Sequence, residues 1–382
     1  MALFLIPPFR VNYSMTELVC SLFVNEHRDY WKKRCQEQLY PLFNGYQIFF
    51  TSSGRTGLYL ILKSLNQQKV YVPAYTCPVV IEAIRLAGKE IIYVRTSPET
   101  FNTDNFEGID DNSIVLATHQ YGNPCDILSV KRLCEERGAV LIEDCAAALG
   151  TKVNGHYVGT YGDFAIFSFN STKLINAPSM GGFIVVKDKG DFNKIVDNLN
   201  FEKNSWSFKI KHLIRSLVFC IAKNKYIYPM IYHLYIKRTI NQEERGTKED
   251  YGKVAETYYH PFYEWQAKVV YKQLCRLSDI QLQRKKQYRF YDSSIQNDKI
   301  IKPIYNPDAV CCRYTIRVKD RGSFYRKCVE KGVDMDHSFS HIICPSDYKG
   351  DKEIALQILN IPFYCGLNDK DMKYIVNVLN SI

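Results

Sequence analysis

Between residues 46 and 190 the sequence alternates short apolar runs with stretches of helical spacing. Strand-like runs lie at 46–51, 70–72, 90–94, 113–117, 139–143, 164–169 and 182–186, and helical spacing occurs at 57–65, 77–87 and 127–137. Strands separated by helices are typical of a mainly parallel sheet with helical crossovers, and the last two runs predict a hairpin around a loop. Ligands of such sheets bind at the carboxyl ends of the strands, so a functional site is expected there.

The length and composition of the chain indicate a globular protein with more than one domain. Its 382 residues are 46% hydrophobic, and a prior of about 100–200 residues per domain predicts two closely joined domains. A disordered chain, a collagen-like fibre and a simple coiled coil are excluded. We divide the chain into an N-terminal helical segment (1–45), a large α/β domain (46–200), a basic apolar helical insertion (201–254), and a C-terminal helix with a small α+β domain (255–382).

The second half of the chain has weaker patterns. Residues 241–253 are polar and predict a surface loop, and residues 255–291 predict a long helical stretch. A strand at 313–318, a helix at 323–331, an irregular part and a closing helix at 369–382 are expected to follow.

The cysteines and the N-terminus indicate a cytoplasmic protein. Thirteen cysteines are scattered without any pair spaced by two residues, which favours reduced and mostly buried thiols over disulfides or a zinc site. The start MALFLIPPFR is too short an apolar run for a signal peptide, and no run of 18 apolar residues predicts a membrane span. No metal site is expected.

Polar residues follow several of the strand-like runs. Ser52-Ser53-Gly54-Arg55-Thr56-Gly57 comes after the first run and opens a helix, where free N–H groups can bind an anion; an ordinary turn and helix cap is the alternative. Asp144 ends a buried run. It is either a buried acid that needs a cationic or hydrogen-bonding partner, or a helix N-cap. Lys173 follows the run at 164–169. It is either a residue that forms a Schiff base or an ordinary solvated surface lysine.

Taken together, these features have the order of a pyridoxal phosphate site. That cofactor needs a lysine for its covalent link, an acid that keeps the pyridine nitrogen protonated, and an anchored phosphate. A phosphate cradle near residue 54, an acid at 144 and a lysine at 173 match those requirements.

The motifs resemble the DegT/StrS family of sugar aminotransferases, a branch of the fold-type I pyridoxal phosphate enzymes. The matching runs are SSGRTGLYLIL (52–62), VPAYTCPVVIEAI (72–84), THQYGNPCDI (118–127), VLIEDCAAALG (140–150), YGDFAIFSFNSTK (161–173) and MGGFIVV (180–186), with weaker matches over 255–382. The resemblance implies an aspartate-aminotransferase-like fold, with a large domain around a mainly parallel, seven-stranded type of sheet and a small C-terminal α+β domain.

The resemblance also implies roles for individual residues. Lys173 would hold pyridoxal phosphate and shuttle protons, and Asp144 would pair with the pyridine nitrogen. Ser53, Gly54, Arg55 and the adjacent Thr56 occupy the phosphate-binding turn, Ser168 matches a serine that contacts the phosphate, and His119 and Cys77 lie near the cofactor.

Three positions depart from the family pattern. Ala147 stands where a glutamine is common, and Cys77 stands where an aromatic residue often stacks on the ring. Residues 259–262 (YHPF) replace the Asn-x-Arg-Met that helps to form the site across a dimer. The cofactor assignment survives these changes, and they point to a divergent branch with its own substrate.

The resemblance implies an enzyme that converts a keto-sugar, nucleotide- or lipid-linked, to an amino-sugar with an amino-acid donor such as glutamate, in surface polysaccharide or glycan synthesis. A homodimer with shared active sites is implied as well. A pyridoxal phosphate-dependent dehydratase or isomerase is one alternative, although such members often replace the lysine by histidine. A non-catalytic regulatory member of the fold is another.

Residues 203–240 concentrate positive charge. They hold eight Lys and Arg residues and no acid, among many apolar side chains, in a chain of net charge +10. Such a segment suits an anionic membrane surface, which would place the enzyme at the inner face of a membrane. The alternative is a helical excursion packed on the body or on a partner subunit, with solvated lysines. Nucleic-acid binding is not expected, because no binding motif accompanies the charge.

Overall fold

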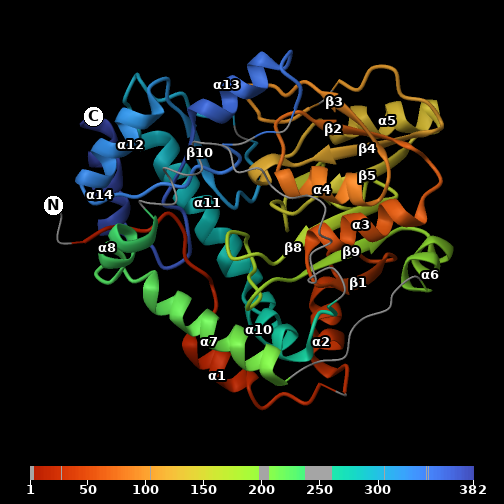
Figure 1. Ribbon diagram of the computed structural model, residues 1–382, viewed down its shortest axis with the longest axis horizontal. Helices are drawn as coiled ribbons and strands as arrows, with labels where there is room; N and C mark the ends of the chain where they lie inside the picture. The colour runs from red at the N-terminus through yellow and green to blue at the C-terminus, as the bar shows by residue number, and fades with distance from the viewer. Residues whose placement is uncertain are drawn as a thin grey trace.

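The computed structural model describes residues 4–197, 206–236 and 260–382, except His27, Asp104, Tyr305, His341 and Ile343 (Figure 1). The loop expected at 241–253 and the boundaries drawn at residues 200 and 254 lie outside the described residues.

A seven-stranded sheet forms the centre of the large domain. Its order is β1 (Gln47–Thr51), β9 (Gly182–Val186), β8 (Phe164–Ser168), β5 (Val140–Asp144), β4 (Ser113–Thr118), β2 (Lys69–Pro73) and β3 (Glu90–Val94). Neighbours pair in parallel from β8 to β3, whereas β9 runs antiparallel to both β1 and β8. The expected mainly parallel sheet and the hairpin are therefore confirmed.

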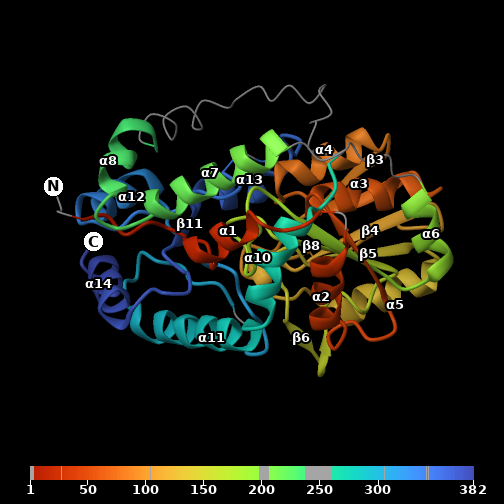
Figure 2. The ribbon, with the colours of Figure 1, turned by 90° about the horizontal axis from the view of Figure 1, so that it is seen from below.

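Helices cover both faces of this sheet (Figure 2). Alternate strand residues face opposite ways: Ile114 and Leu116 pack with α3 (Gly54–Ser64) and α4 (Pro78–Leu86), whereas Val115 and Ala117 pack with α5 (Ile127–Arg137). Helices α2 (Tyr30–Leu39) and α10 (Glu264–Leu274) extend the second layer over β8 and β9, and α6 (Lys189–Asp197) joins the first. Because both faces are covered, ligands reach the sheet at its edges.

A second unit is built on two antiparallel strands, β10 (Tyr314–Arg317) and β11 (Ile358–Ile361). Helices α11 (Leu277–Ser294), α12 (Arg321–Glu330) and α14 (Asp369–Asn380) surround an aromatic core that includes Tyr291 and Phe324. The sequence predicted an irregular stretch before the last helix, which is wrong, because α13 (Lys349–Gln357) and β11 lie there. Strand β11 has only four residues and owes its pairing to distant β10, so no local period marks it.

The helix predicted from 255 to 291 is divided. Within its described part, α10 ends at Leu274 and α11 begins at Leu277. Between them Arg276 leaves the helical region (φ −114°, ψ 22°), and its guanidinium binds Glu17 at 2.6 Å and the Asn12 carbonyl at 2.7 Å. Tertiary contacts therefore break a pattern that is locally helical. Helix α10 packs on the large domain, and α11 crosses to the second unit (Figures 1 and 2).

The described part of the basic insertion lies against the body of the protein. Helix α7 (Trp206–Ala222) runs along α1 (Met15–Ser21), and α8 (Tyr228–Ile231) leads into a π-helical turn, Tyr232–Ile236 (Figure 1). The Tyr228 hydroxyl donates to buried Asp334 at 2.6 Å, and Tyr325 donates to the same carboxylate at 2.7 Å. Burial raises the pKa of Asp334 to about 6. These contacts tie the insertion to the second unit.

Three lysines of this segment point inward rather than into solvent. Lys209 pairs with Glu26 at 3.4 Å, Lys225 pairs with Asp371 at 2.7 Å, and the Lys223 ammonium lies 4.4 Å from the centroid of the Phe9 ring. The sequence predicted solvated lysines for a packed excursion, which is wrong for these three, because spacing along a helix does not show which neighbour supplies an acid or a ring.

The remaining global features concern cysteines and membrane spans. All thirteen cysteines are free, and eight of them are buried. Among the described residues, no helix has both the length and the apolar character needed to cross a bilayer.

Candidate active site

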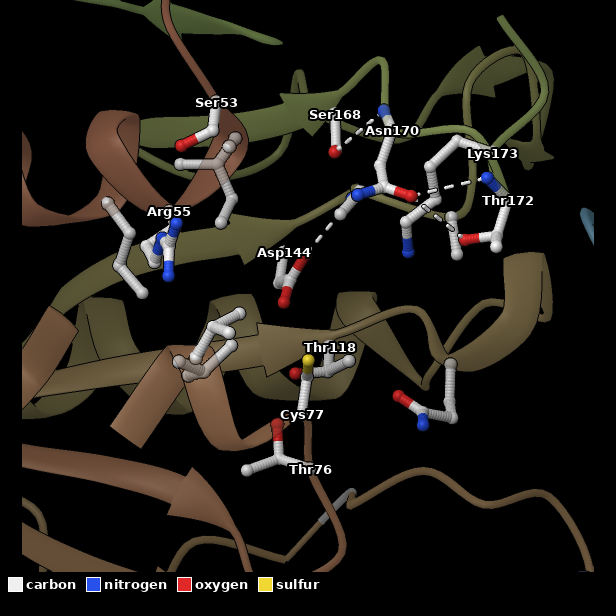
Figure 3. A pocket seen from close by; sticks show the side chains of 18 of the residues that line it. Ser53, Arg55, Thr76, Cys77, Thr118, Asp144, Ser168, Asn170, Thr172 and Lys173 are labelled. Carbon is white, nitrogen blue, oxygen red and sulfur yellow. Dashed lines mark hydrogen bonds between the residues drawn. The ribbon is translucent and has the colours of Figure 1, made fainter. Parts of the chain in front are cut away.

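One cavity of about 270 Å³ opens at the carboxyl edge of the parallel strands (Figure 3). Eight of the nine predicted site residues line it: Ser53, Gly54, Arg55, Cys77, His119, Asp144, Ser168 and Lys173. They come from the ends of β1, β4, β5 and β8 and from the start of α4, so the sheet itself brings them together. Thr56, the ninth, is not among the lining residues.

The first wall of the cavity is the N-terminus of α3. Ser53 caps this helix, since its Oγ accepts from the Thr56 backbone N–H at 3.1 Å. The Thr56 hydroxyl lies 2.8 Å from that of Ser52 and 3.0 Å from that of Ser53. Thr56 thus stabilises the turn by hydrogen bonds without lining the cavity. The helix directs free N–H groups and its positive dipole end to the cavity.

Two glycines fix how closely this helix approaches the sheet. A Cβ atom on Gly182 would lie 2.5 Å from the Phe167 carbonyl oxygen and 2.6 Å from the Gly54 nitrogen, and one on Gly54 would lie 3.2 Å from the Ser168 Cβ. Close packing of backbone on backbone therefore requires small residues at both positions.

Arg55 contributes a cation whose charge is partly balanced. It pairs with Glu82 of α4 at 3.2 Å, and both side chains are largely buried. Arg55 still lines the cavity, so it adds donors beside the helix N-terminus.

Asp144 ends β5 at the base of the cavity. Its Oδ1 accepts from the Ala146 N–H at 3.0 Å, and no hydrogen bond to Oδ2 is found within the part of the chain that the structure describes. Burial raises the pKa of this carboxyl, while the Ala146 hydrogen bond, Lys173 and His119 lower it. A carboxylate in this setting is best stabilised by a cationic donor that enters the cavity.

Lys173 stands on a tightly wound turn across the cavity from Asp144. The Asn170 carbonyl accepts from the Lys173 N–H at 2.9 Å, and the Asn170 side chain accepts from the Thr172 N–H at 3.3 Å (Figure 3). For the Lys173 Nζ, no hydrogen bond or ion pair is found among the described residues. The turn therefore fixes the position of the Lys173 backbone, and its Nζ remains available to a ligand.

Asn176 locks this turn to α10. Its Nδ2 donates to the carbonyls of Asn170 at 2.8 Å and Lys173 at 2.9 Å, and its Oδ1 accepts from the Asn12 N–H at 2.8 Å. Gln273 completes the lock, because its side chain binds both the N–H and the carbonyl of Asn176. Neither residue was predictable from the sequence, since they do not touch the cavity and lie 97 positions apart.

We expect Asn176→Ala to lower the free energy of unfolding by about 2–3 kcal/mol, because it leaves several buried donors and acceptors without partners. Denaturant unfolding followed by circular dichroism measures this loss. Exposed Asn105 serves as the control, and its replacement by Ala is expected to cost less than about 0.5 kcal/mol. Equal stability of the Asn176 variant and the wild type would contradict the lock.

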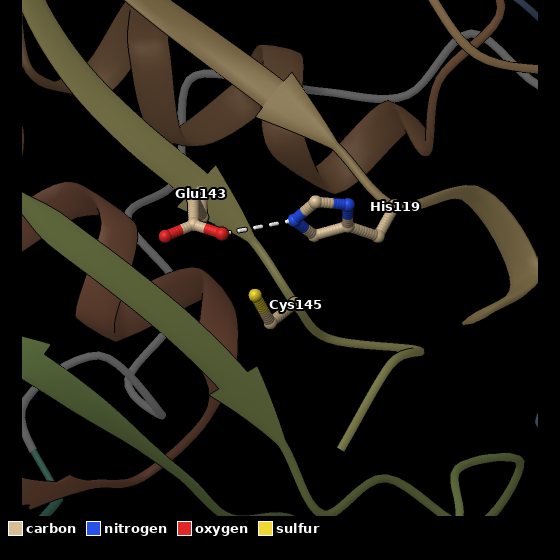
Figure 4. A group of neighbouring side chains, drawn as sticks. All are labelled: His119, Glu143 and Cys145. Atoms are coloured by element: carbon tan, nitrogen blue, oxygen red, sulfur yellow. Dashed lines mark hydrogen bonds and ion pairs between the residues drawn. The ribbon is translucent and has the colours of Figure 1, made fainter. Parts of the chain in front are cut away.

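His119 belongs to a buried cluster behind the cavity (Figure 4). Its Nδ1 accepts from the Cys125 N–H at 3.3 Å, so its Nε2 carries the proton that is donated to Glu143, 3.1 Å away. His119, Glu143 and Cys145 could by distance hold a metal. However, the Glu143 oxygens also accept from the N–H groups of Gly159, Tyr161 and Gly162 at 2.7–2.8 Å. These bonds use the lone pairs that a metal needs, and they make the cluster a hydrogen-bond hub.

The residues that depart from the family pattern lie in the cavity lining or in the core. Cys77 and Ala147 line the cavity, and burial raises the pKa of the Cys77 thiol. Phe262 stacks on Phe50 in the core, with ring centroids 5.3 Å apart. Gln266 of α10 donates to the carbonyls of Pro178 and Met180 at 2.8 and 2.7 Å, which holds the loop after Lys173.

The cavity also contains polar groups that the sequence analysis did not assign. Within the described ranges, Thr118 Oγ1 and Gln120 Nε2 are buried without hydrogen-bond partners, and Arg313 also lines the cavity. Thr118 and Gln120 flank His119 in the motif THQYG, so their position was a usable signal. Arg313 lies in the second unit, and no nearby motif marked it.

The central sheet and the second unit together form a fold that solved structures share. The aminotransferase PseC of Helicobacter pylori, described as involved in the biosynthesis of pseudoaminic acid, superposes with a TM-score of 0.75 over 99% of this chain and 98% of that chain, at 13% identity. The sugar aminotransferase CalS13 of Micromonospora echinospora superposes with a TM-score of 0.73 over 98% and 99%, at 19% identity. The expected fold-type I architecture is thereby confirmed.

Sequence comparison then finds the same family resemblance in the large domain. Residues 45–205 match the sequence model of the DegT/DnrJ/EryC1/StrS aminotransferase family, which confirms the resemblance. The GDP-perosamine synthase of Escherichia coli O157:H7 is 32% identical over 182 residues, which are 45% of this chain and 50% of that protein. The UDP-N-acetyl-3-dehydro-alpha-D-glucosamine 3-aminotransferase of Acidithiobacillus ferrooxidans is 32% identical over 36% of this chain and 39% of that protein. The chain thus spans half or less of these curated relatives.

Proposed function

We propose that this protein is a pyridoxal phosphate-dependent aminotransferase that converts a keto-sugar to an amino-sugar with an amino-acid donor, glutamate being the first candidate. The observation that carries the proposal is the cavity itself. It joins the Lys173 ammonium, the buried Asp144 carboxylate and the N-terminus of α3 in one space.

The residues present fit this cofactor. Asp144 is buried with an oxygen for which no donor is found among the described residues, and a protonated pyridine nitrogen supplies both a donor and a charge. The capped helix start, Arg55 and Ser168 offer donors to a phosphate. When bound, the cofactor supplies an electron sink for the carbon that carries the amino group.

Lys173 and Asp144 have separate roles in the proposed reaction. Lys173 Nζ holds the cofactor and moves a proton to and from the substrate carbon, a task suited to an amine held on a rigid turn. Asp144 keeps the ring nitrogen protonated. The buried walls around the Asp144 carboxylate exclude water, which strengthens each of these charge interactions.

The proposed substrate class is inferred from the names of the similar proteins. The two curated relatives are named for a GDP-linked and a UDP-linked sugar, and PseC is described in a sugar pathway as well. We propose a keto-sugar on a nucleotide or lipid carrier, in polysaccharide or glycan synthesis. We also propose a cytoplasmic homodimer with shared sites, as the resemblance implies.

The function is tested with purified protein reconstituted with pyridoxal phosphate. Keto-sugar nucleotides and lipid-linked keto-sugars are screened with glutamate, and amino-sugar formation is followed by mass spectrometry. Transfer of the amino group supports the proposal. Loss of water or isomerisation without a donor would favour the dehydratase or isomerase, and a protein that binds no cofactor would favour the non-catalytic alternative.

A separate proposal concerns the membrane. Helix α7 exposes an apolar stripe formed by Trp206, Ile210, Ile214 and Val218, with exposed Lys211 and Arg215 beside it. Aromatic and aliphatic side chains flanked by cations suit the interface of an anionic bilayer. We propose that this stripe, and not the inward-facing lysines, is what contacts a membrane surface.

We expect Ile210→Glu combined with Val218→Glu to abolish flotation of the full chain with vesicles that contain anionic lipid. Both side chains are exposed, so the fold is expected to remain intact. Leu282→Glu, on the exposed face of α11, is the control and should float like the wild type. Failure of the wild type to float, or flotation of the double variant, would remove the membrane proposal.

A further inference from the structure

We propose that Gln120 binds the cofactor ring, with its side-chain amide donating a hydrogen bond to the phenolic oxygen of the ring. This inference rests on the proposed function, and it assigns a ligand to a buried donor that no described residue satisfies. Gln120 thereby stands in for the glutamine that is common at position 147 in the family that the chain resembles, where this chain has alanine.

The side chain of Gln120 is a donor without a partner. The residue is 5% exposed and lines the cavity, and its Nε2 is buried with no hydrogen bond to any described residue. Its backbone N–H donates to the Asn102 side chain at 2.9 Å, so the main chain is held in place. Thr118, two positions earlier on the same wall, has a buried hydroxyl that also lacks a partner within the described ranges. Buried polar groups of this kind are costly unless a polar ligand satisfies them.

The segment that carries Gln120 lies against Ala147. The His119 N–H donates to the Asp144 carbonyl at 3.1 Å, and a Cβ atom on Gly122 would lie only 2.8 Å from the Ala147 carbonyl oxygen. Gln120 and Ala147 both line the cavity, and the alanine methyl leaves space that a longer side chain would fill. An amide at position 120 therefore borders the part of the cavity where a glutamine at 147 would lie.

The substituents of the ring and the order of the strands agree on this contact. In pyridoxal phosphate the carbon that bonds the lysine lies opposite the ring nitrogen, and the phosphate arm and the phenolic oxygen lie on opposite sides of the line between them. Asp144, the partner of the nitrogen, ends β5. The phosphate cradle at the start of α3 packs on β8 and β9, to one side of β5, whereas β4 is the neighbour on the other side. With the phosphate in its cradle, the phenolic oxygen faces the end of β4, where Gln120 lies.

The other titratable and charged groups beside Gln120 are already engaged. The Tyr121 hydroxyl lies 2.7 Å from that of Tyr75, and Arg313 pairs with Asp336 at 2.5 Å. Burial raises the pKa of Tyr121, while Arg313, Tyr75 and Gln120 lower it. The raised pKa keeps this phenol neutral at physiological pH, so it supplies no anion to which the amide could donate.

The contact has an electronic consequence. The phenolic oxygen carries negative charge when the cofactor is joined to Lys173, and it shares the proton of the nitrogen that joins them. A donor stabilises that charge, so the oxygen holds the shared proton less tightly. Gln120 therefore lowers the pH at which this proton leaves.

The first test compares two cofactors that differ at this oxygen. Pyridoxal phosphate can ionise there, whereas 3-O-methylpyridoxal 5′-phosphate carries an uncharged ether. Each is titrated into the cofactor-free protein, and binding is measured by equilibrium dialysis. We expect Gln120→Leu to weaken pyridoxal phosphate binding by about 10- to 100-fold and binding of the methylated analogue by less than about 3-fold. Gln296→Leu, at an exposed glutamine, is the control and should bind both cofactors like the wild type.

Two further variants keep the test open if leucine disturbs the wall. Gln120→Met matches the length of glutamine without its donor, and the same loss is expected. Ala147→Gln added to Gln120→Leu restores an amide beside the ring and is expected to recover at least about 10-fold of the lost affinity.

The visible absorbance of the bound cofactor gives an independent readout. We expect the midpoint of its pH titration to be about one pH unit higher in Gln120→Leu than in the wild type, because the phenolic oxygen without its donor keeps the shared proton to higher pH. A role of Gln120 in packing alone would not move this midpoint.

The outcomes separate this inference from the proposed function. If Gln120→Leu weakens both cofactors equally, or leaves the pH midpoint unchanged, the ring contact is wrong, and amino transfer by the wild type still upholds the function. Recovery of selective binding and of the midpoint by Ala147→Gln supports the contact. A wild type that binds neither cofactor would overturn the contact and the proposed function together.

Discussion

Lys173→Ala is expected to give a protein that lacks the borohydride-sensitive absorbance of a lysine-bound cofactor and is at least about 10⁴-fold slower in amino transfer. The loss combines the covalent attachment with the proton transfer, and neither the Asn170 turn nor the Asn176 lock supplies another amine. Absorbance spectra before and after borohydride measure the first effect, and initial rates with glutamate measure the second.

The same variant is expected to fold normally. For the Lys173 side chain no hydrogen bond or ion pair is found among the described residues. Its removal takes a cation from the neighbourhood of buried Asp144, so the free energy of unfolding of the cofactor-free protein should fall by no more than about 1 kcal/mol. Lys187→Ala, at an exposed lysine that follows β9, is the control for loss of a charge. A Lys173 variant that keeps the borohydride-sensitive absorbance would place the attachment elsewhere and refute the assignment.

Asp144→Asn is expected to lower the rate of amino transfer without lowering the stability of the cofactor-free protein. Without the carboxylate the ring nitrogen loses its charged partner, and we expect amino transfer to fall by about 10²- to 10⁴-fold, with weaker cofactor retention in dialysis. Cofactor-free Asp144→Asn should nevertheless be as stable as the wild type at neutral pH, or more stable, because the variant no longer buries a negative charge.

The direction of the pH dependence follows from the raised pKa of Asp144. Between the ordinary pKa of the unfolded carboxyl and the higher pKa of the folded one, the native state holds more protons than the unfolded state. Stability of the wild type therefore falls as pH rises through this window, and the cost stays constant above it. The asparagine variant has no such step.

Denaturant unfolding of the cofactor-free proteins from acid to neutral pH measures this difference. The gap between Asp144→Asn and the wild type should widen as pH rises and then level off. Asp111→Asn, at an exposed carboxyl, should show no such widening. A gap that instead closes with rising pH would mean that the carboxylate stabilises the empty site, contrary to the effect of burial.

The order of strands and helices in the large domain was predictable from sequence because each element carries its own signal. The apolar alternation of β4 and β5 places Thr118 and Asp144 at strand ends, and parallel pairing brings those ends to one edge. Helical spacing was predicted from residue 57, whereas α3 begins at Gly54, because the first turn is set by the Ser53 cap and Gly54-Arg55-Thr56 has no apolar residue to mark a helical period.

The second unit and the basic segment were less predictable. Strand β11 and the break before α11 arise from pairings with β10 and with Glu17, and neither partner is near in sequence. Similarly, the acid for Lys225 is Asp371, 146 positions away. Helical spacing reveals which residues share a face, but not what packs against it.

By itself, therefore, the sequence determined the parallel sheet and the strand ends that carry Asp144 and Lys173, because local periodicity and the residues that follow each strand encode both. The tertiary structure alone decided that Asn176 and Gln273 lock the lysine turn, that three lysines of the basic segment turn inward, and that Arg313 reaches the cavity. Each of these depends on side chains brought together from distant parts of the chain. Packing and the need to pair buried polar groups select such partners, and neither leaves a pattern in adjacent residues.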